Sequence, residues 1–195
     1  MELLKSYGFS GFLHTTEFEN FVKIFKLRKI LPRNIATDFK DVADQDVINR
    51  TKEEIKNSLR FYYKEKTPTN FAAKYTNPVM LVFNRALIFD SKAKFASGNA
   101  GSQYTVITKN AEKALEFDWE LIFERGFHSE SKCEVEDEEM RKYVIKHRRN
   151  AEFLYEGELS TENIESIVFK QTADYDKAKE LFGNDPRFCI KPELF

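Results

Sequence analysis

The segment KHRRNAEFLYEGEL, residues Lys146 to Leu159, places four basic or potentially basic side chains directly before an apolar run that contains one central carboxylate, Glu152. If the run is a strand, alternation places Ala151, Phe153 and Tyr155 on one face and Glu152 on the other. A glutamate on a solvated strand face needs no functional explanation, whereas a glutamate at the floor of a cleft can stabilise a cationic centre or accept a proton. The segment taken alone favours the solvated face, and the rest of the chain must decide between the two.

Two helices are expected before this segment. Thr16 and Glu19 have the spacing of a capping box, and the apolar residues that follow predict a helix from about Glu17 to Lys29. A second helix is expected in DQDVINRTKEEIKNSLR, residues 44–60, because apolar or small residues recur there every four positions.

The remaining elements alternate irregularly between strand and helix patterns. Strands are expected in PVMLVFNRALIFD (78–90, with a turn near Asn84), WELIFE (119–124), RNAEFLYEG (149–157) and IESIVFK (164–170), a glycine-rich loop in ASGNAGSQ (96–103), and a short helix in ADYDKAKELFG (173–183). Because no regular βαβ alternation is present, an α+β fold is favoured over a doubly wound sheet. The length of 195 residues predicts one domain, residues 1–195.

The composition limits the classes of function. Basic and acidic residues nearly cancel at a net charge of −1, so any nucleic-acid site must be a local patch. Nineteen Phe and eight Tyr predict an aromatic core with rings to spare for a cleft or a stacking surface. Two cysteines make no disulfide framework, and neither a signal-peptide core nor a membrane-spanning run is found. We therefore expect a cytoplasmic protein.

Several common kinds of active site are absent from the sequence. Neither a G-x-G-x-x-G motif nor a G-x-x-x-x-G-K-[ST] loop occurs, which excludes the two standard phosphate-binding loops. His14, His128 and His147 are scattered and have no partners at metal-ligand spacing, so no metal is expected. The G-x-S-x-G elbow of serine hydrolases is also missing.

Five short segments occur in a characteristic order: HTTEFENF, VINRT, LRFYYKEKTPTNF, FASGNAG and RNAEFL. The first is similar to the pattern H-x-T-x-x-x-N-[hydrophobic] and the last to R-x-A-E-[hydrophobic], and together they resemble the DarT family of toxins. These enzymes move ADP-ribose from NAD onto a nucleic-acid base. The resemblance covers most of the chain and implies an ADP-ribosyltransferase-like fold, with central mixed or antiparallel sheets and flanking helices.

The resemblance also bears on the acceptor base. Thr67-Pro68-Thr69 and Ser97-Gly98-Asn99 look closer to the guanine-modifying branch of the family than to its thymidine-modifying branch. Two positions depart from the family pattern, because Glu65-Lys66 stands where Pro-Arg or Pro-Lys is usual and a Tyr follows Phe61-Tyr62 in place of Phe. These departures affect local contacts.

The reaction explains why a carboxylate would be needed. Cleavage of the bond between nicotinamide and ribose passes through a transition state of oxocarbenium character, as in glycoside hydrolysis. By resemblance, Glu152 would be the catalytic residue, stabilising this charge and accepting the proton of the incoming base. Arg50, on the second expected helix, would also be catalytic and would bind the NAD phosphates or ribose.

The resemblance further implies a set of NAD-binding residues: His14, Thr16, Asn20, Arg50 and Tyr62. Each has a simpler alternative. Thr16 could serve only as a helix cap, Arg50 could be solvated on a charged helix, and Tyr62 could belong to the core. His14 could merely cap the chain before the first helix.

A nucleic-acid contact is expected from the basic run of Lys146, His147, Arg148 and Arg149, with an exposed ring such as Phe127 stacking on a base. A helix end is an equally good explanation of the run. The resemblance implies a single-stranded DNA substrate and a cognate antitoxin, such as a hydrolase of the ADP-ribosylated base, in a toxin–antitoxin or phage-defence system. An RNA-modifying transferase and a non-enzymatic nucleic-acid-binding module remain alternatives.

Overall fold

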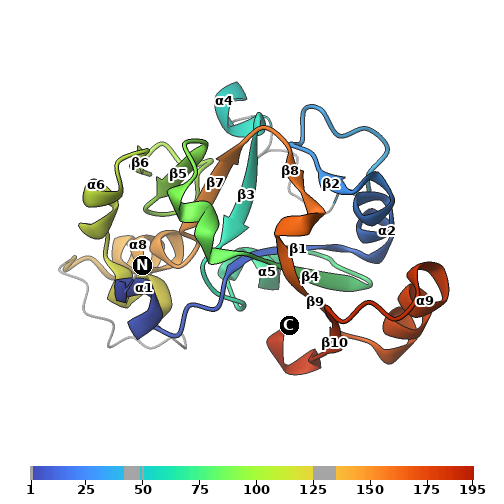
Figure 1. Cartoon of the computed structure of the whole chain (residues 1–195). Helices are drawn as coiled ribbons and strands as arrows, with labels where there is room; N and C mark the ends of the chain where they lie inside the picture. The colour runs from blue at the N-terminus through green and yellow to red at the C-terminus, as the bar shows by residue number, and fades with distance from the viewer. Residues whose placement is uncertain (1, 42–48, 50, 125–134) are drawn as a thin grey trace.

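A large mixed β-sheet organises the part of the chain that the computed structural model describes, residues 2–41, 49, 51–124 and 135–195 (Figure 1). Its eight strands lie in the order β10-β9-β4-β1-β3-β7-β5-β6. Their bounds are β1 Phe12–Glu17, β3 Ser58–Tyr62, β4 Pro78–Phe83, β5 Ala93–Ala96, β6 Ile107–Thr108, β7 Glu152–Glu156, β9 Ile164–Phe169 and β10 Phe188–Ile190. β10 runs parallel to β9 and the other neighbours are antiparallel.

The sheet opens between β1 and β3. β1 pairs with β4 along its whole length, but it pairs with β3 only at Leu13 and Tyr62. The two strands point in clearly different directions beyond this position (Figure 1). Backbone pairing that stops after one position leaves space between two strands, and this space becomes the cleft described below.

Aromatic side chains hold the two halves of the sheet together. Phe12 of β1 stacks on Phe153 of β7 with ring centroids 3.7 Å apart, and both rings are fully buried. Phe61 of β3 packs against both Phe153 and Phe83 of β4. Ring pairs of this kind contribute about 0.5–1.5 kcal/mol beyond their buried area. The aromatic core expected from the composition is therefore confirmed.

Helices cover the sheet at both ends. α2 (Phe18–Leu27) packs on α9 (Thr172–Phe182) through Phe25 and Phe182, whose ring centroids are 4.8 Å apart. α2 ends at Arg28, whose left-handed φ of 56° turns the chain into β2 (Lys29–Ile30), which pairs with β8 (Leu159–Ser160). The other helices are α1 Glu2–Ser6, α4 Glu53–Lys56, α5 Pro68–Ala72, α6 Ala111–Leu115, α7 Trp119–Phe123 and α8 Glu138–Arg148, with 3₁₀ turns at Arg85–Phe89, Thr161–Asn163 and Pro192–Leu194.

Much of the predicted order is confirmed. The fold is α+β, strands occupy β4, β7 and β9, residues 97–106 form a loop, and α9 ends before Gly183, whose φ is +79°. A left-handed residue after a helix is most easily supplied by glycine.

Four local predictions were wrong. WELIFE is not a strand but the helix α7, because the Asp118 side chain caps Leu121 N and the Trp119 indole donates to the Ala114 carbonyl. The second half of PVMLVFNRALIFD is a 3₁₀ turn capped by Asn84.

The second expected helix is also shorter than predicted, since α4 ends at Lys56 and Leu59 belongs to β3, which pairs with β7. Residues 42–48 and 50 lie outside the described residues.

The capping box at Thr16 and Glu19 is also absent. α2 continues directly from β1, and its N-cap residue is Glu17, which makes no side-chain cap. The Glu17 carboxylate instead accepts hydrogen bonds from the backbone N–H groups of Thr76 and Asn77, at 2.7 and 3.1 Å. Thr16 is thereby left available for another contact.

Candidate active site

Glu152 lies in the interior of the sheet. It is the first residue of β7, opposite Tyr62 of β3 and Ala96 of β5, and it is 0% exposed. Its Oε2 accepts a hydrogen bond from the backbone N–H of Ala100 at 2.7 Å. The simpler interpretation of this glutamate, a solvated strand face, was therefore wrong.

Arg60 of β3 is the principal partner of Glu152. Arg60 Nη2 donates to both carboxylate oxygens at 2.7 and 2.9 Å, and Nε donates to Oε1 at 3.1 Å. Nη2 also lies 3.2 Å from Asn99 Oδ1 in the loop after β5. Burial, the largest influence, would lower the pKa of Arg60, but the attraction and hydrogen bonding of Glu152 together with the influence of Tyr62 leave the pKa raised. Arg60 is therefore a permanent cation beside the carboxylate.

The sequence analysis did not identify Arg60. Its signal was present, because it is a lone cation in an apolar strand and shares one face with Tyr62 by alternation. What was missing was the pairing register, which places Tyr62 opposite Glu152 and brings Arg60 within reach of the carboxylate. Register depends on how two distant segments meet.

A histidine fixes the loop that covers Glu152. His147 of α8 is 9% exposed, and its Nε2 lies 3.1 Å from Thr105 Oγ1 in the loop of residues 97–106. A Cβ atom added to Gly98 would lie only 2.3 Å from the same nitrogen, so only glycine allows this approach. Burial, and to a lesser extent Arg148, lowers the pKa of His147 and favours a neutral ring. His147 thus supports the loop that supplies Ala100 N–H.

A cleft of about 270 Å³ occupies the space where β1 and β3 diverge. Its lining includes three of the predicted NAD-binding residues, His14, Thr16 and Asn20, and also Arg60. His14 Nδ1 lies 3.2 Å from the Arg60 carbonyl oxygen. If Nδ1 carries the proton, Nε2 is left as an acceptor. Burial lowers the pKa of His14, with the Arg60 carbonyl acting in the opposite direction, so the neutral ring is favoured.

Asn20 attaches the outer wall of the cleft to α2. Its Nδ2 donates to Thr16 Oγ1 at 3.2 Å and to the Lys40 carbonyl at 2.9 Å, while its Oδ1 accepts from Lys40 N at 2.8 Å. The segment from Leu31 to Phe39 that precedes Lys40 lines the cleft. The hydrogen bond to Thr16 is the contact that the missing capping box leaves available.

Neither of the other two predicted NAD-binding residues, Tyr62 and Arg50, is among the described residues that line the cleft. Tyr62 does not line the cleft but lies directly opposite Glu152 and packs against the cluster of Leu13, Met80 and Val168. Burial, and then the neighbouring Glu152, raises the pKa of Tyr62, so its phenol stays protonated. Arg50 lies outside the described residues.

The basic run before Glu152 divides into two pairs. Lys146 is exposed and Arg148 half-buried, whereas His147 and Arg149 are buried. Arg149 is 4% exposed and its Nη2 lies 3.1 Å from Glu124 Oε2. The expectation of four phosphate contacts therefore has to be corrected, because only Lys146 and Arg148 reach the surface.

Two exposed aromatic rings lie at α8: Tyr143 on the helix and Tyr104 beside it. Tyr143 is 45% exposed, stacks on His147, and meets Tyr104, 66% exposed, edge to face at 6.0 Å. Phe127, the ring suggested for stacking, lies outside the described residues. Tyr104 belongs to the loop that covers Glu152, so this ring pair is linked to the site through Ala100.

The described residues contain neither a metal-ligand cluster nor a membrane-spanning helix. Within residues 2–41, 49, 51–124 and 135–195, no three His, Cys, Asp or Glu side chains are grouped so that they could hold a metal ion. No helix in the described part of the chain is long and apolar enough to cross a membrane.

Comparison with known proteins places this site in a family. The profile described as "ssDNA thymidine ADP-ribosyltransferase, DarT" matches residues 13–195. The solved structure of Thermus sp. 2.9 DarT in complex with ADP-ribosylated ssDNA matches with a TM-score of 0.77 at 15% identity, over 94% of this chain and 95% of that chain.

Two further solved structures are similar. Thermus sp. 2.9 DarT in complex with NAD+ matches with a TM-score of 0.70 at 14% identity, over 94% of this chain and 96% of that chain. Thermosipho africanus DarTG in complex with ADP-ribose matches with a TM-score of 0.72 at 15% identity, over 94% of this chain and 50% of that chain. A search of curated protein sequences gave no match. With a family profile matching nearly its whole length, the chain belongs to the DarT family of ADP-ribosyltransferases.

Proposed function

We propose that this protein transfers ADP-ribose from NAD to a base of single-stranded DNA, with Glu152 as the catalytic carboxylate. The observation that carries the proposal is the fully buried Glu152, held by an arginine whose side chain also lines a cleft. The fold match to Thermus DarT structures solved with NAD+ and with ADP-ribosylated ssDNA supports both substrates.

In the proposed reaction, the bond between nicotinamide and ribose breaks and nicotinamide leaves with the bonding electron pair. A nitrogen of the acceptor base then bonds to the ribose carbon, and its proton passes to Glu152 and on to water. Glu152 stabilises the positive charge that develops on the ribose between these events. His14, Thr16 and Asn20 would hold NAD in the cleft, and Arg50 would bind its phosphates or ribose. Tyr62, opposite Glu152 and outside the cleft lining, would contribute to NAD binding by packing beside the catalytic carboxylate.

His14→Gln is expected to weaken NAD binding by roughly 2- to 10-fold, the range of one neutral hydrogen bond, with a smaller effect on the rate at saturating NAD. Because the pKa of His14 lies below its ordinary value of 6.5, its ring should be mainly neutral above that pH, and NAD affinity should change little between about pH 8 and about pH 7. Calorimetric titration with NAD at several pH values measures both effects.

An affinity for NAD that falls with a midpoint near pH 6.5 in the wild type, and not in His14→Gln, would contradict this role. A wild-type chain that binds oligonucleotides but not NAD in the same titration would instead be a non-enzymatic nucleic-acid-binding module.

We propose guanine as the acceptor base. The support is the form of the Thr67-Pro68-Thr69 and Ser97-Gly98-Asn99 segments, of which the first contacts Asn150, two residues before Glu152, and the second contacts Arg60. Thr69 N donates to Asn150 Oδ1 at 3.0 Å, and Asn99 Oδ1 accepts from Arg60 at 3.2 Å. The family profile that matches this chain is described as a thymidine ADP-ribosyltransferase, which makes thymine the competing outcome.

Otherwise identical oligonucleotides that each lack one base, incubated with NAD and weighed by mass spectrometry, identify the acceptor. We expect modification of single strands that contain guanine and little modification of the duplex, because extrusion of a paired base costs a few kcal/mol. Modification that persists without guanine would refute the choice of base, and modification of RNA alone would refute DNA as the substrate.

The biological setting is also a proposal. We propose that residues 1–195 form one catalytic domain, since the sheet takes strands from Phe12 to Ile190. We further propose that the protein acts as the toxin of a toxin–antitoxin or phage-defence pair. Its antitoxin would hydrolyse the ADP-ribosylated base. The similarity to Thermosipho africanus DarTG supports this setting.

A further inference from the structure

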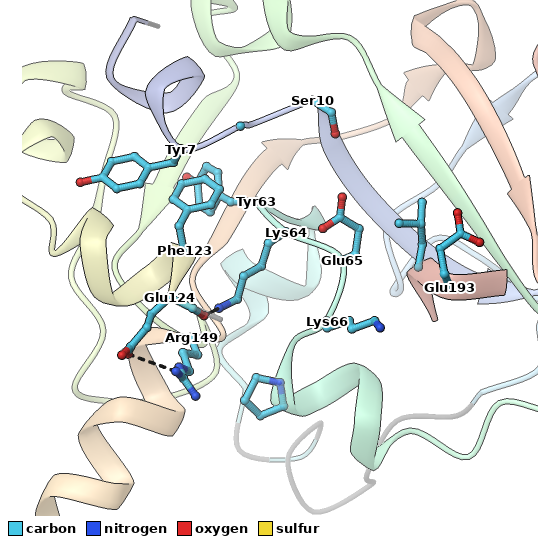
Figure 2. A pocket seen from close by; sticks show the side chains of 13 residues that line it. Tyr7, Ser10, Tyr63, Lys64, Glu65, Lys66, Phe123, Glu124, Arg149 and Glu193 are labelled. Carbon is cyan, nitrogen blue, oxygen red and sulfur yellow. Dashed lines mark hydrogen bonds and ion pairs between the residues drawn. The ribbon is translucent and has the colours of Figure 1, made fainter. Parts of the chain in front are cut away.

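A second cavity lies at the end of the sheet where β3 finishes and β7 begins (Figure 2). It measures about 460 Å³ and shares no lining residue with the cleft that holds His14. Tyr63 and Lys64 line it directly after β3, and Arg149 lines it three residues before Glu152. The cavity is therefore close in the chain to the catalytic carboxylate but separate from the proposed NAD cleft.

One wall of the cavity is aromatic. Phe123, at the end of α7, stacks in parallel on Tyr7, with centroids 5.2 Å apart and an angle of 3° between the rings. Tyr7 is 36% exposed and Phe123 is half-buried. Behind them, Trp119 packs edge-on against Tyr63 and close to Phe123. A planar group that enters the cavity therefore meets a rigid ring pair backed by the core.

The part of the wall next to Phe123 carries positive charge. Lys64 Nζ donates to the backbone carbonyl of Glu124 at 3.1 Å, and Arg149 Nη2 donates to the Glu124 carboxylate at 3.1 Å (Figure 2). Both cations thus contact Glu124, Lys64 through its backbone and Arg149 through its side chain. Burial, and then repulsion by Arg149, lowers the pKa of Lys64 to about 8, while Glu124 and Glu65 oppose the shift.

The remaining charges lie across the cavity. Glu65 and Glu193 lie on the other side of the cavity from Glu124 and Arg149, and Lys66 lies between the two sides (Figure 2). A ligand that satisfies both sides is planar, anionic at one end, and a hydrogen-bond donor at the other. A nucleotide has all three properties: a base that stacks, a phosphate, and amino or imino N–H groups.

We propose that this cavity binds the nucleotide next to the modified base in the single-stranded DNA substrate, its base against the ring of Phe123 and its phosphate at Lys64. The inference rests on the proposed function, because Glu152 must act on that strand. Lys64 follows Tyr62, the strand partner of Glu152, by two residues. When one nucleotide is bound at Lys64, the adjacent nucleotide, which carries the acceptor base, therefore lies beside the Glu152 carboxylate.

The test uses a fluorescent single-stranded oligonucleotide that contains the acceptor base in its unmodified form. Its binding to the protein is measured by fluorescence anisotropy in the absence of NAD. Lys64→Met should weaken binding by about 3- to 30-fold and reduce the salt slope by roughly 0.7, the contribution of one phosphate on a single strand. Phe123→Leu keeps the apolar volume but removes the ring, and should weaken binding at least about fivefold.

Wild-type affinity should also fall as the pH rises through about 8, because Lys64 must be protonated to bind phosphate, and Lys64→Met should abolish this dependence. The matched control is Lys109→Met, which removes an exposed lysine paired with Glu156 near β6 and should bind as the wild type does. Melting temperatures identify a variant that fails to fold. If Phe123→Leu does so, Lys64→Met still decides.

Four outcomes would overturn the inference, and they differ from one another. If the wild type binds and modifies the oligonucleotide and both Lys64→Met and Phe123→Leu bind it equally well, the cavity does not bind DNA, and the proposed function is unaffected. If the wild type binds no oligonucleotide, both the DNA-binding role of the cavity and the proposed function are refuted. If Lys64→Met loses NAD affinity and DNA affinity equally, the cavity binds NAD instead. If inorganic phosphate alone displaces the DNA, the cavity is a site for free phosphate.

Discussion

Glu152→Gln is expected to reduce the rate of ADP-ribose transfer at least about 10²-fold, and up to about 10⁴-fold, the range lost with a general base. The amide has nearly the same shape as the carboxylate but cannot balance the positive charge on the ribose or accept the proton. NAD affinity should change much less, because the cleft residues His14, Thr16 and Asn20 remain in place. Single-turnover assays beside NAD titrations separate the two quantities.

Glutamine is the better substitution because Glu152 is fully buried and Arg60 depends on it. Alanine would leave the Arg60 guanidinium without its bidentate partner and Ala100 N–H without its acceptor. Loss of one partner of a buried pair costs about 3–5 kcal/mol, which could be mistaken for a catalytic effect. Glutamine still accepts the hydrogen bond of Ala100. Its amide NH2 then faces Arg60, so Glu152→Gln should melt below the wild type but above Glu152→Ala, and activity should be lost at temperatures where the variant is folded.

The matched control is Glu156→Gln. Glu156 lies on the same face of β7, four residues and about 13 Å further along the strand, too far to reach the same ribose. It is exposed, and its carboxylate lies 3.4 Å from both Lys94 and Lys109. This variant should retain activity. Near-normal turnover by Glu152→Gln, or an equal loss in Glu156→Gln, would mean that Glu152 is not the catalyst.

The catalytic candidate could be predicted from the sequence, but its partner could not. Glu152 is a single charge in an apolar strand, and the motif around it carried the resemblance. Arg60 becomes its partner only because β3 pairs with β7 in a register that puts Tyr62 opposite Glu152. A shift of one residue would turn Arg60 to the other face, and no local pattern fixes such a register between segments 92 residues apart.

The mistaken elements have the same origin. WELIFE has the composition of a strand, but the Asp118 cap and the packing of Trp119 on Tyr63 favour a helix. His147 belongs to a basic run in the sequence, yet it is buried by its approach to Gly98, which comes from a different part of the chain. Tertiary contacts of this kind override local propensity, and they are formed by residues that the sequence pattern treats separately.

Arg60→Met is the other substitution with a large expected effect. Glu152 has 0% exposure, so its negative charge depends on Arg60 and on Ala100 N–H. Without the cation, the buried carboxylate loses its counter-ion and is no longer held in position by the bidentate contact. We therefore expect transfer to fall at least about tenfold, since misplacement of a catalytic group is costly. Arg60→Lys keeps the charge but loses the planar, bidentate contact, and should be intermediate.

The control for the loss of an arginine is Arg187→Met. Arg187 is 27% exposed and pairs with Asp185 at 2.6 Å, which closely matches the 32% exposure and 2.7 Å contact of Arg60 with Glu152. A third of the Arg60 side chain is in contact with water, so the stability cost in either variant should lie below the ~3–5 kcal/mol of a fully buried pair. Both variants should melt earlier than the wild type, but only Arg60→Met should lose activity. If Arg60→Met keeps the turnover of the wild type, Arg60 does not hold Glu152 in its active position, and its role is confined to lining the cleft.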